Sequence, residues 1–433
     1  MALFSKDALQ PGVRSREVFA WAMYDFANSG YTTVVLTAVF AAYFVGAVAD
    51  GAPWATFAWT LALSVSHAIV MATMPAMGAW ADLHAAKKRL LLLTTAGCVI
   101  ATAALALVGP GAVVLAMVLI VFSNVCFAWG ESLIAAFLPE LAKPAAMGRV
   151  SGWGWSLGYL GGMLALGLCL GYVLWAQAQG QAASQFVPVT MLITAAVFAL
   201  AASVTLGMLT ERAQPRAGAL QDAGLRASLR RLKTTFLEAR EYVDFMWLLA
   251  CAVAYQGGVA VAITLAAIYA EQVIGFVQQE TMVLIFVLNI AAMVGAFLFG
   301  YAQDRLGHKL TLGITLAGWM LTCVMAALTT TKGGFWYAAA LAGFCMGSSQ
   351  SSGRAMAGLF APPARSAEFF GLWAFATRLA SIIGPLSYGA ITWITDGNQR
   401  LAIGTTAGLF LVGLILLLPV NIARGRSKAL GTT

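Results

Sequence analysis

The stretch Trp21-Ala-Met-Tyr24-Asp25-Phe-Ala-Asn28-Ser-Gly-Tyr31 opens an apolar run that continues through Phe44. The run is long enough to cross a membrane as a helix, yet it holds a carboxylate and a carboxamide. Because an ionised carboxylate is costly in hydrocarbon, such residues usually face a protein interior or a wet cavity. Asp25, Asn28 and Thr32 share one helical face by their spacing. We predict that this face lines the path of a solute.

The composition extends this reading to the whole chain. Hydrophobic residues make up 61% of the 433 residues and charged residues only 10%, against roughly 25% charged residues in soluble domains. A spanning helix needs about 20 mostly apolar residues. Twelve such segments are predicted, near 18–48, 56–81, 89–109, 111–138, 149–176, 187–209, 243–274, 278–301, 310–330, 333–360, 367–395 and 399–423.

The basic residues gather in alternate breaks between these segments. They precede the first segment and follow the second, fourth, eighth, tenth and last, whereas the opposite side carries only Lys332 and Arg400. Because Lys and Arg collect in cytoplasmic loops, we predict a multi-pass protein of the cytoplasmic (inner) membrane with both termini cytoplasmic. Topology then explains the net charge of +8, and no nucleic-acid partner is expected.

One long break divides the chain. We predict an N-terminal six-helix bundle over 1–209, a cytoplasmic linker over 210–242 and a C-terminal six-helix bundle over 243–433. Within the linker, apolar residues recur at helical spacing, which predicts an amphipathic helix on the membrane surface; these residues are Leu225, Leu229, Leu232 and Phe236. The linker joins and anchors the two halves, or alternatively binds a regulatory partner.

An internal repeat relates the two halves. Gly78-Ala-Trp-Ala-Asp82 lies between the second and third segments, and Gly300-Tyr-Ala-Gln-Asp304 lies 222 residues later between the eighth and ninth. The aromatic-glycine stretch at Gly152 has a counterpart at Gly371, at the openings of segments five and eleven. Two similar six-helix bundles in parallel orientation form the architecture of the major facilitator superfamily.

The motifs make the resemblance more specific. The stretch Gly300-x-x-x-Asp304-Arg305-x-Gly-x-Lys309 resembles the loop signature of that superfamily. Within the superfamily the chain resembles the vacuole-effluxer-like family, whose bacterial members are called unknown major facilitators. The matching stretches are 21–31, Leu138-Pro-Glu-Leu141, Gly148-Arg-Val-Ser-Gly152, Gly158-Tyr-Leu-Gly-Gly162 and Ala367-Glu-Phe-Phe-Gly-Leu372. Where that family often has an acidic turn in helix seven, this chain has Tyr255-Gln-Gly-Gly258.

In the superfamily's fold, helices one, four, seven and ten line a central cavity. Asp25 and Glu131 lie about seven residues from the cytoplasmic ends of the first and fourth segments, so at 1.5 Å per residue both are roughly 10 Å deep. Arg354 stands at the repeat position of Glu131, and Arg378 lies near the middle of the eleventh segment. We therefore predict opposite charges facing one another across a shared cavity.

These charges suggest specific roles. A carboxylate in a partly dry cavity can take up a proton in one conformation and release it in another, so Asp25 and Glu131 are predicted to couple protons or bind a cation. A buried arginine stays charged and can hold a carboxylate. The alternative is a fixed ion pair that only joins the halves, for instance Glu131 with Arg354. The predicted substrate-binding residues are Tyr24, Asn28, Asn124, Gln256, Gln350, Arg354 and Arg378.

The loop signatures imply a separate gating role. By resemblance, Asp82 and Asp304 each pack against the start of helix eleven or helix five of the other half, with Arg305 beside them. An anion interacts favourably with a helix N-terminus. We therefore predict that these residues close the cytoplasmic side and do not touch the substrate.

Taken together, these patterns predict a secondary active transporter that moves a small polar metabolite by alternating access, with proton coupling. Family resemblance favours an amino acid-like solute and export. The alternatives are a lipid flippase, a peptide permease, or a transporter-like sensor that moves no solute. The chain has no nucleotide-binding loop, and its six cysteines lack metal-ligand spacing. We expect no cofactor, no metal site, no enzymatic activity, and a monomer within the bilayer.

Overall fold

The computed structural model describes residues 4–215, 238 and 240–431. Within these residues the chain is helical, with one isolated bridge between Leu9 and Ala142 and no strand. Eleven helices of this part are long and apolar enough to cross a membrane. The predicted all-helical polytopic fold is therefore confirmed. The amphipathic helix predicted within the linker lies outside the described residues.

The N-terminal half begins after a short 3-10 turn, η1 (Lys6–Ala8). Its first span changes from α-helix to π-helix along its length, which the sequence pattern does not indicate. That span comprises α1 (Ser15–Tyr31), η2 (Thr32–Ala38), α2 (Phe40–Tyr43) and η3 (Phe44–Val48). The remaining elements are α3 (Ala55–His84), α4 (Lys87–Ala104), η4 (Leu105–Leu107), α5 (Val113–Ala135), α6 (Leu138–Leu141), η5 (Pro144–Ala146), α7 (Met147–Ala178) and α8 (Ala183–Met208).

The C-terminal half repeats this order. Its elements are α10 (Val243–Tyr269), η6 (Ala270–Ile274), α11 (Gln278–Leu306), α12 (His308–Leu328), α13 (Lys332–Phe360), η7 (Pro363–Arg365), α14 (Ser366–Ile394), α15 (Gln399–Leu417) and α16 (Ile422–Leu430). The tenth predicted span, near 333–360, corresponds to α13, which is 29 residues long but is not among the eleven apolar spans. It carries the polar run Ser348-Ser-Gln-Ser-Ser352 followed by Arg354. Residues of this run form hydrogen bonds with side chains of α7, α10, α11 and α12.

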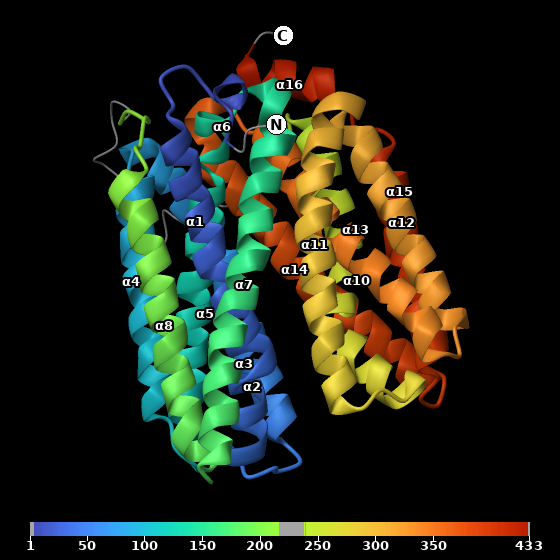
Figure 1. Ribbon diagram of the computed structural model, residues 1–433. Coiled ribbons are helices and arrows are strands. Elements are labelled where there is room, and N and C mark those ends of the chain that lie inside the picture. Colours follow the sequence, from blue (N-terminus) through green and yellow to red (C-terminus); the bar gives the residue numbers. More distant parts are fainter. Residues whose placement is uncertain (1–3, 216–237, 239, 432–433) are drawn as a thin grey trace.

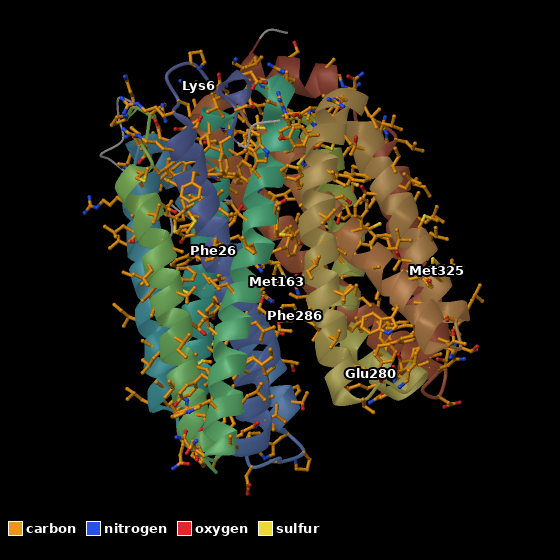
Figure 2. The ribbon with its side chains drawn as sticks, viewed as in Figure 1. Lys6, Phe26, Met163, Glu280, Phe286 and Met325 are labelled. Carbon is orange, nitrogen blue, oxygen red and sulfur yellow. The ribbon has the colours of Figure 1, made fainter. Side chains whose placement is uncertain are left out.

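The two halves stand side by side and meet at the end of the molecule that carries both termini (Figure 1). Toward the opposite end they diverge. Across the midline α3 packs against α14, and α7 packs against α11. Figure 2 shows Lys6 near the end with the termini and Glu280 near the opposite end. The ion pair that Glu280 makes with Lys332 at that opposite end stays within the C-terminal half.

Small residues allow the close crossings between the halves. A Cβ atom added at Gly152 of α7 would lie 2.5 Å from the carbonyl oxygen of Ala296 on α11. Its repeat counterpart Gly371 on α14 is equally crowded, since a Cβ there would lie 2.7 Å from Cα of Pro75 on α3. The aromatic-glycine repeat of the sequence therefore marks two places where the backbones of opposite halves come close.

Candidate functional site

A buried ion pair joins the two halves near their centre. Nη1 of Arg354 on α13 donates to Oδ2 of Asp25 on α1 at 2.6 Å. The same guanidinium donates to Ser151 of α7 twice, from Nε to Oγ at 3.1 Å and from Nη2 to the backbone oxygen at 2.8 Å. The two charged side chains are only 7% (Arg354) and 10% (Asp25) exposed. Three helices from both halves therefore converge on one guanidinium.

Aromatic rings and a glycine complete this site. The Arg354 guanidinium lies 4.8 Å from the ring centroid of Trp21 and 5.2 Å from that of Trp155, a cation–π arrangement. Trp21 is held by its indole N–H, which donates to the backbone oxygen of Ile134 at 2.8 Å. A Cβ atom at Gly154 would lie 2.5 Å from Oδ2 of Asp25 and 2.6 Å from Nη2 of Arg354. The ion pair thus occupies the space that a side chain at position 154 would fill.

A second ion pair crosses the midline in a more open setting. Nη2 of Arg378 on α14 donates to Oε2 of Glu131 on α5 at 2.5 Å. Here the Glu131 side chain is 41% exposed and that of Arg378 is 15% exposed. Nε of Arg378 is buried and has no hydrogen-bond partner among the described residues. This pair therefore keeps an unused donor beside an accessible carboxylate.

The structure pairs Arg354 with Asp25 and Arg378 with Glu131. The suggested ion pair of Glu131 with Arg354 is therefore wrong. Glu131 and Arg354 stand 223 residues apart, and so do Trp155 and Arg378. Arg354 contacts Trp155, and Arg378 contacts Glu131. The reason is geometric, because residues related by a twofold repeat face each other only on the axis itself. Away from the axis each residue faces a different helix of the other half, so the repeat pairs position 131 with 378 and position 155 with 354.

The structure divides the predicted substrate-binding residues into two groups. Gln256 of α10 donates to Oε1 of Gln350 at 2.8 Å, and both residues belong to the C-terminal half. Gln350 lies on α13, the helix that also carries Arg354. Tyr24 points away from the midline, since its hydroxyl bonds that of Thr95 on α4 at 2.8 Å. The structure thus does not bring Tyr24 together with the charged residues.

Asn28 and Asn124 are both buried within the N-terminal half. The Asn124 amide donates to Oγ of Ser66 on α3 at 2.6 Å. The side-chain oxygens of both residues are buried without a hydrogen-bond partner in the part of the chain that the structure describes. Each side-chain oxygen can therefore still accept a hydrogen bond, and no donor among the described residues supplies one.

Two symmetry-related contacts, which we call the latches, hold the halves together at the end with the termini. The carboxylate of Asp82 accepts from the backbone N–H groups of Ala367 and Glu368 at 3.1 and 2.9 Å. That of Asp304 accepts from the N–H groups of Gly148 and Arg149 at 2.9 and 3.1 Å. Each carboxylate therefore caps a helix N-terminus of the other half, as the loop signatures predict.

The second latch also carries an ion pair. Nε of Arg149 donates to Oδ2 of Asp304 at 3.0 Å. Arg305, also predicted to act in gating, is exposed next to Asp304. The packing of the latches is thus established, and their gating role remains a prediction.

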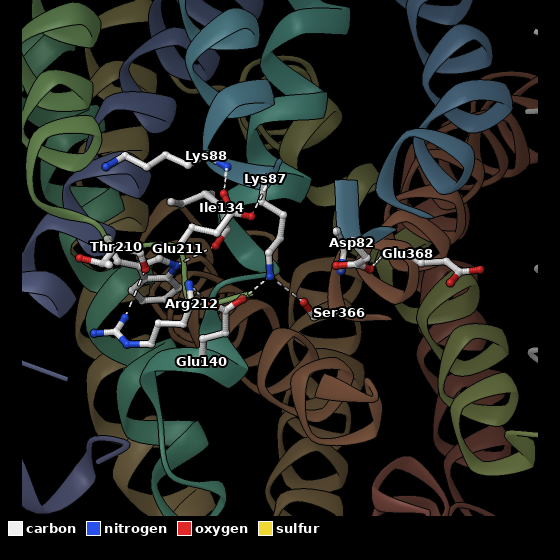
Figure 3. A network of polar contacts seen from close by, with 12 residues as sticks. Asp82, Lys87, Lys88, Ile134, Glu140, Thr210, Glu211, Arg212, Ser366 and Glu368 are labelled. Carbon is white, nitrogen blue, oxygen red and sulfur yellow. Dashed lines mark hydrogen bonds and ion pairs between the residues drawn. The ribbon is translucent and has the colours of Figure 1, made fainter. Parts of the chain in front are cut away.

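A network beside the first latch was not predicted (Figure 3). The ammonium of the fully buried Lys87 pairs with Glu140 and donates to Oγ of Ser366 across the midline at 3.1 Å. The carboxylate of Glu211 caps the start of α4, accepting from the N–H groups of Lys87 and Lys88 at 2.8 and 2.9 Å. Glu140 and Ser151 both lie in stretches that carry the family resemblance, which is the only sequence signal for them.

The fold, with two repeated six-helix halves around polar groups at their interface, is that of major facilitator superfamily transporters. Two solved structures share it at low sequence identity. The human organic anion transporter MFSD10 (TETRAN) has a TM-score of 0.74 at 17% identity, over 94% of this chain and 100% of that one. The proton:xylose symporter XylE has a TM-score of 0.72 at 12% identity, over 94% of this chain and 95% of that one.

The sequence comparisons define the family. The profile of the family described as vacuole effluxer Atg22-like matches residues 54–430, and the chain belongs to that family. The uncharacterized MFS-type transporter YxiO of Bacillus subtilis (strain 168) is 28% identical over 406 residues, which cover 92% of this chain and 93% of YxiO. The chain is therefore an MFS-type transporter, and the suspected family is confirmed.

Proposed function

We propose that the protein is a secondary active transporter that moves a small polar metabolite, an amino acid-like solute, by alternating access with proton coupling. The observation that carries this proposal is the unequal exposure of the two ion pairs that cross the midline. One pair is sealed, as a conformational lock requires. The other is accessible, as a solute site requires.

The Glu131–Arg378 pair is the proposed solute site. A zwitterion carries a carboxylate and an ammonium group, which complement an arginine and a glutamate respectively. The Arg378 guanidinium makes one hydrogen bond within the described part of the chain, so it has donors left for a second carboxylate while it still holds Glu131. Its Nε is buried and would become available when the halves move. The 41% exposure of the Glu131 side chain leaves oxygen available to an incoming ammonium.

The Asp25–Arg354 pair is the proposed coupling element. Arg354 belongs to the C-terminal half, whereas Asp25 and Ser151 belong to the N-terminal half. Protonation of Asp25 removes the charge that holds the guanidinium, and this weakens a contact between the halves. A proton taken up at Asp25 would therefore favour separation of the halves at this level, which is the link that coupling requires.

The latches are the proposed gate, and the basic end of the molecule is the proposed cytoplasmic side. Both termini and both latches lie at that end. The positive-inside pattern supports a cytoplasmic location for it. The described conformation is then closed toward the cytoplasm, in a bacterial-type inner membrane, and export would begin after the latches release.

Flux in proteoliposomes tests the proposal. Labelled amino acids are loaded inside, and their movement is followed with a proton gradient of either direction and with none. We expect gradient-dependent movement in the wild type. Asp25→Asn leaves Arg354 without its counter-charge and should lower the melting temperature. The folded fraction should still bind substrate but lose the dependence on the gradient. Gradient-driven accumulation by this variant would remove Asp25 from the coupling mechanism.

An organic anion is the second candidate substrate. The two central arginines and the fold shared with the organic anion transporter MFSD10 favour it. The same vesicles separate the candidates, because a dicarboxylate without an ammonium group should compete only if Arg378 alone recognises the solute. Binding without flux would instead indicate a sensor, and movement of labelled lipid alone would indicate a flippase.

A further inference from the structure

The C-terminal half contains a cavity that the proposed solute site does not use. It lies among α10, α11, α12, α13 and α15, toward the ends of these helices remote from the termini, and has a volume of about 50 Å³. Its wall is largely apolar and many of its side chains are small. Among them are Gly258, Ala262 and Ala266 of α10 and Ala338, Ala339 and Ala342 of α13.

The few polar groups on the wall are already satisfied. The hydroxyl of Thr322 donates to the oxygen of Gly318 at 3.0 Å, and that of Thr406 donates to the oxygen of Ala402 at 2.9 Å. The hydroxyl of Tyr269 donates to the oxygen of Ala326 at 2.8 Å. No wall hydroxyl therefore has its proton free for a ligand. An apolar cavity of this kind excludes water and accepts apolar molecules.

The internal repeat explains why the space exists. In the N-terminal half Tyr43 donates to the oxygen of Val108 at 3.1 Å. This bond joins the end of the first span to the end of the third, as the bond from Tyr269 to Ala326 does in the C-terminal half. Three residues before Tyr43 stands Phe40, whose ring packs against Trp59 at 6.2 Å between centroids. Three residues before Tyr269 stands Ala266, on the wall of the cavity. The C-terminal half thus lacks a ring that fills the N-terminal half.

We propose that this cavity binds the end of a lipid acyl chain. The lining helices are spans of a membrane protein, so hydrocarbon chains are the apolar molecules that surround them. Part of the rim, at Ala262 and Leu288, is half-buried rather than closed. The end of an acyl chain supplies the van der Waals contacts that the missing ring would otherwise make, and it requires no hydrogen-bond partner.

Xenon is the first probe, because it enters apolar cavities of this size and is visible by anomalous scattering. Crystals of the wild-type protein under xenon pressure should show a xenon atom beside Ala266. Ala266→Phe restores the ring of the N-terminal half and should abolish that peak. Ile263→Phe is the matched control, since it adds the same ring at an exposed position of α10 and should leave the peak unchanged. Ordered water in the wild-type cavity, or neither xenon nor chain-like density there, would overturn the proposal.

Lipid dependence is the second measurement and does not rely on xenon. Stripping lipid from the purified protein should lower the melting temperature of the wild type and of Ile263→Phe, and added phosphatidylcholine should restore it. Ala266→Phe should melt higher in the stripped state and respond less to added lipid. If Ala266→Phe does not fold, Ala342→Val is used in its place, because it fills part of the same cavity with a smaller side chain. If added lipid raises the melting temperature equally in the wild type and in the variant with the filled cavity, the occupant is not an acyl chain.

Discussion

Arg354 and Arg378 each bind a carboxylate of the N-terminal half across the midline, but their surroundings are opposite. Arg354 has three hydrogen bonds, two aromatic faces and a side chain that is 7% exposed. Arg378 makes one hydrogen bond within the described part of the chain, has a buried Nε without a partner there, and donates to a carboxylate whose side chain is 41% exposed. The arginine–carboxylate pair therefore has most of its hydrogen-bonding groups occupied and shielded from water at Arg354, whereas at Arg378 donors remain unused and the carboxylate is accessible.

This difference separates two uses of charge in a membrane protein. A saturated pair resists water and solute, and its strength depends on both partners remaining charged. An unsaturated pair at a wet surface contributes little to stability because water competes for both groups. We therefore expect variants at the sealed pair to change stability and coupling, and variants at the open pair to change recognition.

Loss of the sealed guanidinium is the largest expected effect. Arg354→Gln leaves the carboxylate of Asp25 buried without its counter-charge, and removal of one partner of a buried pair costs about 3–5 kcal/mol. We expect a strong fall in melting temperature and in the yield of folded protein, measured by fluorescence-detected size exclusion and thermal shift.

The double variant gives the control for that loss. Asp25→Asn combined with Arg354→Gln removes both charges and should recover much of the stability, because the buried carboxylate is gone. If the double variant is as unstable as the sum of the single variants, Arg354 stabilises the fold through Ser151 and the two tryptophans and not through Asp25.

Gly154 gives the next largest effect. Gly154→Ala places a methyl group 2.5 Å from Oδ2 of Asp25, so the pair must shift. Overpacking of this kind costs about 1–3 kcal/mol. Gly167→Ala on the same helix is the control, since nothing lies within 4 Å of its added Cβ, and it should leave the melting temperature unchanged or raise it. Equal effects of the two variants would show that helix propensity, and not the ion pair, decides the outcome.

The latches should respond less, and unequally. Asp82→Asn and Asp304→Asn each remove a charge from a helix N-terminus, an interaction worth up to about 2 kcal/mol. Asp304 also binds Arg149, so we expect its variant to open the end with the termini further. Distances between spin labels across that end, measured by pulsed EPR, should broaden toward an open population. Unchanged distances in both variants would contradict a gating role.

Much of this organisation was predictable from the sequence because it follows from periodicity and repetition. The long apolar segments predicted the spans. The repeat at Asp82 and Asp304 predicted the latches, because a carboxylate at one helix end needs only the N-terminus of a neighbouring helix as its partner. Helix α13 was also predictable as a span from its length, although its polar run lowers its mean hydropathy below that of the other eleven spans.

The pairing within the site was not predictable in the same way. Spacing along a helix gives the face of Asp25 or Glu131 but not the rotation of that face relative to the other half. That rotation depends on the close crossings at Gly152 and Gly371, which are properties of the packed molecule. The burial of Tyr24 and the cavity beside Ala266 are likewise invisible in one sequence, because each depends on which side chains fill the space between helices.

The open pair should show the smallest effect on stability and still affect transport. Glu131→Gln keeps the size of the side chain and a hydrogen-bond acceptor for Arg378, and exposed ion pairs contribute about 0–1 kcal/mol. We expect a melting temperature close to that of the wild type, together with loss of affinity for a solute that carries an ammonium group and retained affinity for a simple carboxylate. Calorimetric titration with an amino acid and with its deaminated analogue measures both. A large loss of stability in Glu131→Gln would mean that this pair, like that of Asp25 and Arg354, holds the halves together, and the contrast between the two sites would then disappear.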